Sequence, residues 1–170
     1  MEESRVALIP KVIVPGALGP KEYGVLLTDR RMIFVLERAS KAVLGVALGG
    51  AIGAAIAEGA ASRRYVDYAN EPPEALAADE KNIVVPYVSI RELRMKKSLG
   101  SYSMRVTYTT HEGKTKKLDS VPAAPADQIA QAKATGVKPK AAQREYVRKV
   151  QGALLQALPP VLAQKAVWGI

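Results

Sequence analysis

The stretch from Tyr23 to Glu37, which reads YGVLLTDRRMIFVLE, limits the possible folds more than any other part of the chain. Two apolar runs, Val25–Leu27 and Met32–Leu36, flank the polar corner Thr28–Arg31. Runs of this length on either side of a turn-forming aspartate are typical of an antiparallel hairpin. The sequence therefore predicts a domain built mainly on β-strands.

Further strands are predicted before and after this hairpin. In chain order they are Val6–Val14, Ile83–Tyr87, Ile90–Met95, Tyr102–Thr109 and Lys114–Leu118. Pro10 interrupts the first of them, and proline inside a strand belongs at an edge or a bulge. In the fourth, apolar and polar residues alternate, so one face of that strand should be buried.

The C-terminal part of the sequence predicts helices. A short helix is expected over Pro125–Ala134, ended by Gly136, and a longer one begins at Pro139, since proline fits the first turn of a helix. The longer helix carries an apolar stripe of Val147, Val150, Leu154 and Leu158. We expect this amphipathic helix to cover an open end of the sheet. The apolar tail, residues 161–170, should dock on the domain or on a partner.

The segment Ala42–Ala57 contains no charged residue and has two rows of side chains with a spacing of four positions. One row is small, with Gly45, Gly49 and Gly53, and the other is larger, with Leu44, Leu48, Ile52 and Ile56. On a helix these rows form neighbouring stripes, and the small one lets another backbone approach closely. A membrane span needs about 20 apolar residues, so we expect none here. The helix has three alternative partners: its own barrel, a twin subunit or lipid.

Several classes of function lack their usual residues. The chain has no cysteine, which excludes disulfides, thiolate zinc sites and cysteine nucleophiles, and one histidine, His111, at a predicted turn. No glycine-rich phosphate loop lies between a predicted strand and a helix. The acidic stretch Asn70–Glu80 is predicted to be a mobile loop, so its carboxylates do not indicate a metal site. We expect no catalysis, no metal and no cofactor.

Positive charge is concentrated in the second half of the chain. Residues 1–80 contain 9 lysines and arginines and 11 acidic residues, whereas residues 81–170 contain 16 and 5. Such an excess attracts the phosphates of lipids or nucleic acids. If the predicted strands are neighbours, one outer face can collect the candidate anion-binding residues: Arg91, Arg94, Lys96, Lys97, Arg105, Lys114, Lys116 and Lys117.

Two stretches resemble strands of a known family. Leu26–Val35, LLTDRRMIFV, resembles the second and third strands of bacterial and archaeal pleckstrin-homology-like domains, including the related GRAM group. Val85–Leu93, VPYVSIREL, is similar to a later strand of the same families. The resemblance implies a barrel of about seven antiparallel strands capped by a C-terminal helix. It would form one domain over residues 1–160, with a Gly/Ala-rich helical insertion at 40–80 after the third strand.

Members of this fold bind phosphoinositides or other lipids, bind peptides, or act as scaffolds. Phosphoinositide-binding members place basic residues in the second strand, but Gly24–Thr28 contains none, so the resemblance does not extend to specific inositol-phosphate recognition. We expect a cytoplasmic, non-catalytic module that binds anionic lipid head groups peripherally, through the basic strands and the Ala42–Ala57 helix. The alternative is a protein-binding scaffold or homo-oligomer joined through that helix or the tail. Nucleic-acid binding ranks lower, because few aromatic residues accompany the basic ones.

Overall fold

The computed structural model describes residues 3–17, 19–39 and 63–170. The strands are β1 (Arg5–Val14), β2 (Lys21–Thr28), β3 (Arg31–Ala39), β4 (Ile83–Pro86), β5 (Ile90–Ser98), β6 (Ser101–Thr109), β7 (Thr115–Pro122) and β8 (Val167–Gly169). The helices are α2 (Pro73–Ala78), α3 (Ala126–Ala134), α4 (Pro139–Ala157) and α5 (Pro160–Lys165), with a 3₁₀ turn η4 (Tyr87–Ser89). The predicted helix at Ala42–Ala57, with both of its rows, lies outside the described residues.

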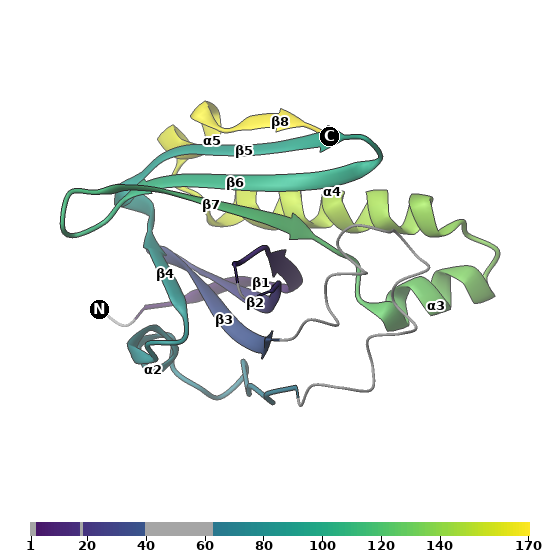
Figure 1. The fold of residues 1–170 in the computed structure, drawn as a ribbon, viewed down its shortest axis with the longest axis horizontal. Coiled ribbons are helices and arrows are strands. Elements are labelled where there is room, and N and C mark those ends of the chain that lie inside the picture. Colours follow the sequence, from purple (N-terminus) through teal and green to yellow (C-terminus); the bar gives the residue numbers. More distant parts are fainter. Residues whose placement is uncertain (1–2, 18, 40–62) are drawn as a thin grey trace.

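The eight strands of the described chain form one sheet in the order β4-β3-β2-β1-β7-β6-β5-β8. Neighbours are antiparallel except β5 and β8, which are parallel. Figure 1 shows β5, β6 and β7 as a layer above β1 to β4. The predicted mainly β fold with a helix after the strands is therefore confirmed. The sheet is open, with β4 and β8 at its two edges, so it is not the closed barrel of about seven antiparallel strands that the resemblance implied. The eighth strand, β8, occupies the free edge of β5.

The main core lies between the two strand layers. Its buried side chains include Tyr23, Val25, Leu27, Met32 and Phe34 below, and Leu93, Met95, Met104 and Val106 above. Along each strand these residues alternate with residues that point to the other side of the sheet, as the pleat of a strand requires. The alternation predicted for the strand that begins near Tyr102 is confirmed, since its apolar residues line this core.

The polar corner between β2 and β3 is held by buried hydrogen bonds. Thr28 is 0% exposed, and its Oγ1 accepts hydrogen bonds from the backbone N–H groups of Arg30 and Arg31 at 3.1 and 3.0 Å. The same hydroxyl donates to the Glu3 carboxylate at 2.5 Å, and the Arg31 guanidinium also binds Glu3. Burial raises the pKa of Glu3, but the hydrogen bonds from Arg31 and Thr28 outweigh it and hold that pKa below its usual value. The corner is thus a structural joint that includes an ion pair between a buried carboxylate and a partly exposed guanidinium.

The second stretch of the family resemblance is attached to this corner. The Tyr87 hydroxyl donates to the Thr28 carbonyl oxygen at 2.9 Å, and the Tyr87 backbone N–H donates to the Arg30 carbonyl oxygen at 3.0 Å. Burial raises the pKa of Tyr87, which keeps the phenol a neutral donor. The two stretches that resemble the known family therefore contact each other, and their hydrogen bonds hold the η4 turn against the corner between β2 and β3.

Helix α4 packs on β1 and β2 and adds to the main core. Each residue of the predicted stripe, Val147, Val150, Leu154 and Leu158, is buried, which confirms the prediction. Sequence reasoning missed Tyr146, whose hydroxyl accepts from the Lys11 N–H at 3.1 Å and donates to the Lys11 carbonyl oxygen at 3.0 Å. The register of β1 with β2 shifts between Ile9 and Val12, so Pro10 lies at a bulge, as predicted. At this bulge the backbone of Lys11 is not paired with β2, and the Tyr146 hydroxyl forms hydrogen bonds with its N–H and carbonyl groups instead.

Replacing Tyr146 with phenylalanine should lower the free energy of unfolding by about 1–2 kcal/mol, because the Lys11 N–H loses its acceptor. Urea unfolding measures this change, and faster hydrogen exchange at the Lys11 amide would locate it. The matched control is Tyr108→Phe, since no hydrogen bond of the Tyr108 hydroxyl is seen among the described residues. Equal stability of the two variants would contradict the assigned role of Tyr146.

The segment that follows residue 62 covers the outer face of β2 and β3. Leu76 of α2 is buried, and together with Val66 it packs against Leu26, Ile33 and Val35 in a second apolar cluster. The prediction of a loop over Asn70–Glu80 is therefore wrong, since α2 lies within it and Leu76 anchors it to the sheet. These apolar side chains outweigh the acidic, proline-rich character that suggested a loop.

The same covering segment explains a glycine in the middle of β2. A Cβ on Gly24 would collide with the Tyr68 hydroxyl and with the Glu37 carboxylate. Tyr68 donates to that carboxylate at 2.7 Å, and Arg63 binds its other oxygen at 2.5 Å. Glycine inside a strand often marks such a close approach. The outer face of β2 is therefore occupied by the protein itself.

Candidate anion-binding surface

Four cations lie together on the outer face of β5, β6 and β7, and we call this set the basic face: Arg94, Lys96, Arg105 and Lys117. Leu93 and Met95 point into the core, so their strand neighbours point outward. The register pairs Arg94 with Arg105 across two strands, and Thr107 with Lys117 across the next two. All four cations are exposed. The strand pattern thus gathers positive charge on one side of the sheet.

Two carboxylates on the same face bind the two guanidinium groups. The Arg94 Nη2 lies 2.6 Å from the Glu92 Oε1, and the Arg105 Nε and Nη2 lie 2.5 and 3.0 Å from the two Asp119 oxygens. The hydrogen bonds to Asp119 raise the pKa of Arg105. Among the ion pairs of the described residues, none includes Lys96 or Lys117. The face keeps an excess of positive charge, and its exposed pairs are weak enough to exchange for an anionic ligand.

The structure separates two further predicted residues from the basic face. Lys97 directly follows Lys96 in the sequence, and Lys116 directly precedes Lys117. Consecutive residues of a strand point to opposite sides of the sheet. The Lys97 Nζ lies 5.9 Å from the centre of the Tyr102 ring, on the side of the core residues. Lys116 pairs with Tyr108, also on that side. Counting all the basic residues of a strand therefore overestimates the positive charge on either face of the sheet.

The remaining two predicted residues are held by partners at the end of the sheet away from the β5–β6 turn. The Arg91 Nε donates to the Thr109 Oγ1 at 2.6 Å, at the irregular start of β5. The Lys114 Nζ lies 2.8 Å from Glu112 in the β6–β7 turn. Of the eight predicted residues, the structure brings four together on one face.

Sequence reasoning did not identify Leu99, which lies at the tip of the β5–β6 turn. Its relative exposure is 105%, and its φ angle of 47° lies in the left-handed region. Lys96 of the basic face is three positions before it. The sequence signal was a Leu-Gly pair between two predicted strands, where a polar residue before the glycine is the usual choice.

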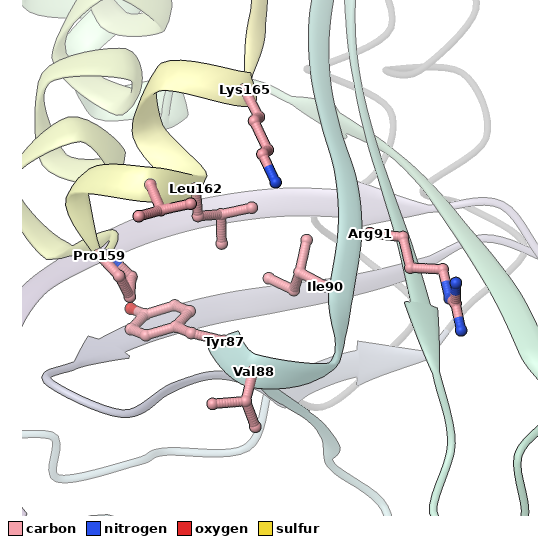
Figure 2. A pocket seen from close by; sticks show the side chains of 8 residues that line it. Tyr87, Val88, Ile90, Arg91, Pro159, Leu162 and Lys165 are labelled. Carbon is pink, nitrogen blue, oxygen red and sulfur yellow. The ribbon is translucent and has the colours of Figure 1, made fainter.

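A pocket of about 430 Å³ opens between η4 and α5, at the start of β5. Figure 2 shows Tyr87, Ile90 and Leu162 around it, with the Lys165 amine directed into it. The Arg91 guanidinium points away from it, in agreement with its bond to Thr109. Val88, 98% exposed, and Val161, 65% exposed, also line the pocket. Its lining is mostly apolar and gathers no cluster of charge.

Within residues 3–17, 19–39 and 63–170, no group of three or more histidine, cysteine and acidic side chains could hold a metal ion. None of the helices in those ranges combines the length and the apolar character that crossing a bilayer requires. His111 lies exposed at the β6–β7 turn.

No family model and no curated protein matches this chain. Among solved structures, the chain is similar to the hSac2 domain from the human phosphoinositide phosphatase Sac2. The TM-score is 0.47 and the identity 7%, over 92% of this chain and 73% of that chain. A likeness at this level does not indicate a function for this chain.

Proposed function

We propose that this protein is a non-catalytic module that binds the anionic surface of a membrane through its basic face. The observation that carries the proposal is the gathering of four exposed cations on the outer side of β5, β6 and β7. Each lysine or arginine near an anionic bilayer contributes about 1 kcal/mol, so several together can hold a protein there. A broad strand face suits many lipid phosphates better than a single enclosed head group.

The absence of aromatic side chains from the basic face favours lipid over nucleic acid. Tyr102 and Tyr108 lie on β6, but they point to the core side of the sheet, away from Arg105. Single-stranded nucleic acid is generally held by bases stacked on aromatic side chains beside the cations. The basic face offers phosphate contacts without such a platform.

We also propose that the chain is a pleckstrin-homology-like domain with its ligand surface moved to the later strands. The order of seven antiparallel strands followed by α4 supports this assignment. In phosphoinositide-binding members the second strand carries basic residues, whereas here the outer face of β2 bears Gly24 and Leu26 and is covered by the segment around Tyr68 and Leu76. A head group has no room on that face, whereas the basic face on β5 to β7 is exposed.

The test is co-sedimentation of the full chain with vesicles of phosphatidylcholine alone and of phosphatidylcholine mixed with phosphatidylserine. We expect binding at low salt to the mixed vesicles and little to the neutral ones. No binding, or equal binding to both, would refute the proposal. Tighter binding to DNA or RNA would favour the nucleic-acid alternative, and a stable homo-oligomer without vesicle binding would favour the scaffold.

A further inference from the structure

The turn between β5 and β6 contains a residue that does not suit its backbone. Ser98 pairs with Ser101, so Leu99 and Gly100 form a two-residue turn in which both φ angles are positive, 47° and 82°. This is the arrangement of a type I′ hairpin turn, which favours Asn-Gly, Asp-Gly or Gly-Gly. Gly100 follows the preference, whereas a leucine in the left-handed region is uncommon and strained.

The unfavourable backbone conformation of Leu99 is not compensated by packing of its side chain. At 105% relative exposure it is as open to water as in an extended chain. Among the non-glycine residues of the described chain, Leu99 alone has a positive φ angle. A strained residue that buries nothing does not stabilise the folded protein, and such strain is typically found at functional sites.

The neighbours of Leu99 indicate what it contacts. Lys96 and Lys97 precede it on β5, one on each side of the strand, so cationic side chains flank the apolar tip. At a bilayer interface, apolar side chains enter the boundary of the acyl chains while lysines stay among the phosphates. The charge around the tip thus suits an anionic bilayer better than an apolar protein groove.

We propose that the β5–β6 turn is the membrane-inserting element, with Leu99 in the acyl boundary of an anionic bilayer and Lys96 and Lys97 at the phosphates. This inference rests on the proposed function and adds the site and the orientation of insertion. The basic face then approaches the bilayer obliquely, with the Leu99 end of the sheet deepest. The β6–β7 turn at the opposite end of β6, which carries His111, stays in water.

The first experiment replaces Leu99 with the asparagine that the turn prefers. We expect Leu99→Asn to bind vesicles containing phosphatidylserine about 10-fold more weakly, since burying a leucine side chain is worth at least that factor. We expect the same variant to melt about 2–4 °C higher, because the turn loses its strain. These opposite changes separate a membrane role from a merely structural one.

The second experiment uses the lack of native cysteine to attach one environment-sensitive dye. In Leu99→Cys the dye emission should shift to the blue when vesicles containing phosphatidylserine are added. In the matched control, His111→Cys, it should not shift.

The outcomes distinguish this inference from the proposed function. If the wild-type chain binds no vesicles, both fail. If it binds and Leu99→Asn binds equally well, or the dye at position 111 shifts instead of the dye at position 99, membrane binding stands and the inserting turn is refuted.

Discussion

Replacing all four basic-face residues with glutamine should weaken binding to anionic vesicles by about three orders of magnitude. Each of Arg94, Lys96, Arg105 and Lys117 is exposed on the same face, and each charge contributes about 1 kcal/mol near an anionic surface. Since 1.4 kcal/mol corresponds to a factor of ten, four charges give roughly a thousand-fold change. Vesicle co-sedimentation at low salt measures the loss.

The matched control removes the same number of charges from the exposed side of α4. Its substitutions are Lys140→Gln, Arg144→Gln, Arg148→Gln and Lys149→Gln. We expect this control to lose less than about ten-fold, because the charges of α4 lie outside the proposed contact and are screened beyond about 10 Å. An equal loss in both variants would show that net charge alone drives binding and would remove the basic face as a site. Thermal unfolding should remain close to wild type for both, since exposed charges contribute little to stability.

Replacing Thr28 with valine should lower the free energy of unfolding by about 2–3 kcal/mol. The two side chains have similar shape, but valine cannot accept from the N–H groups of Arg30 and Arg31 or donate to Glu3. Each buried polar group left without a partner costs about 1–3 kcal/mol. Urea unfolding measures the change.

The control for this prediction is Thr28→Ser, which keeps the hydroxyl and should cost about 1 kcal/mol or less. Equal loss in the serine and valine variants would mean that the methyl group, and not the hydrogen bonds, stabilises the corner. Below its melting temperature the valine variant should bind anionic vesicles like wild type, because Thr28 lies in the structural joint and not on the basic face.

Elements whose pattern is local were predicted well from the sequence. The β2–β3 hairpin follows from two apolar runs around Asp29, and α4 follows from the spacing of Val147, Val150 and Leu154. The bulge at Pro10 follows from the missing N–H of proline. Each of these signals lies within a few residues of the structure that it specifies.

Features that depend on partners distant in the chain were not predictable in this way. In the sequence, Leu76 lies within an acidic stretch that predicts a loop. Its packing against Ile33 and Val35 depends on the tertiary structure. The parallel pairing of β8 with β5 joins segments some 70 residues apart, for which the short tail gives no periodic signal.

The candidate site shows the same limit. The sequence shows where the basic residues are, but the strand register decides which of them share a face of the sheet. The register separates Lys96 from Lys97 and Lys117 from Lys116. The exposure of Leu99 depends on where the turn falls between β5 and β6, which the register also sets.

The most direct test of membrane binding by the basic face is the salt dependence of vesicle affinity for the wild-type chain and the four-residue glutamine variant. We expect the wild-type affinity for vesicles containing phosphatidylserine to fall steeply as salt rises, because the contacts are between exposed charges. We expect the variant to bind weakly at every salt concentration. A wild-type affinity that does not change with salt, or a variant that keeps the wild-type salt dependence, would contradict the proposed binding surface.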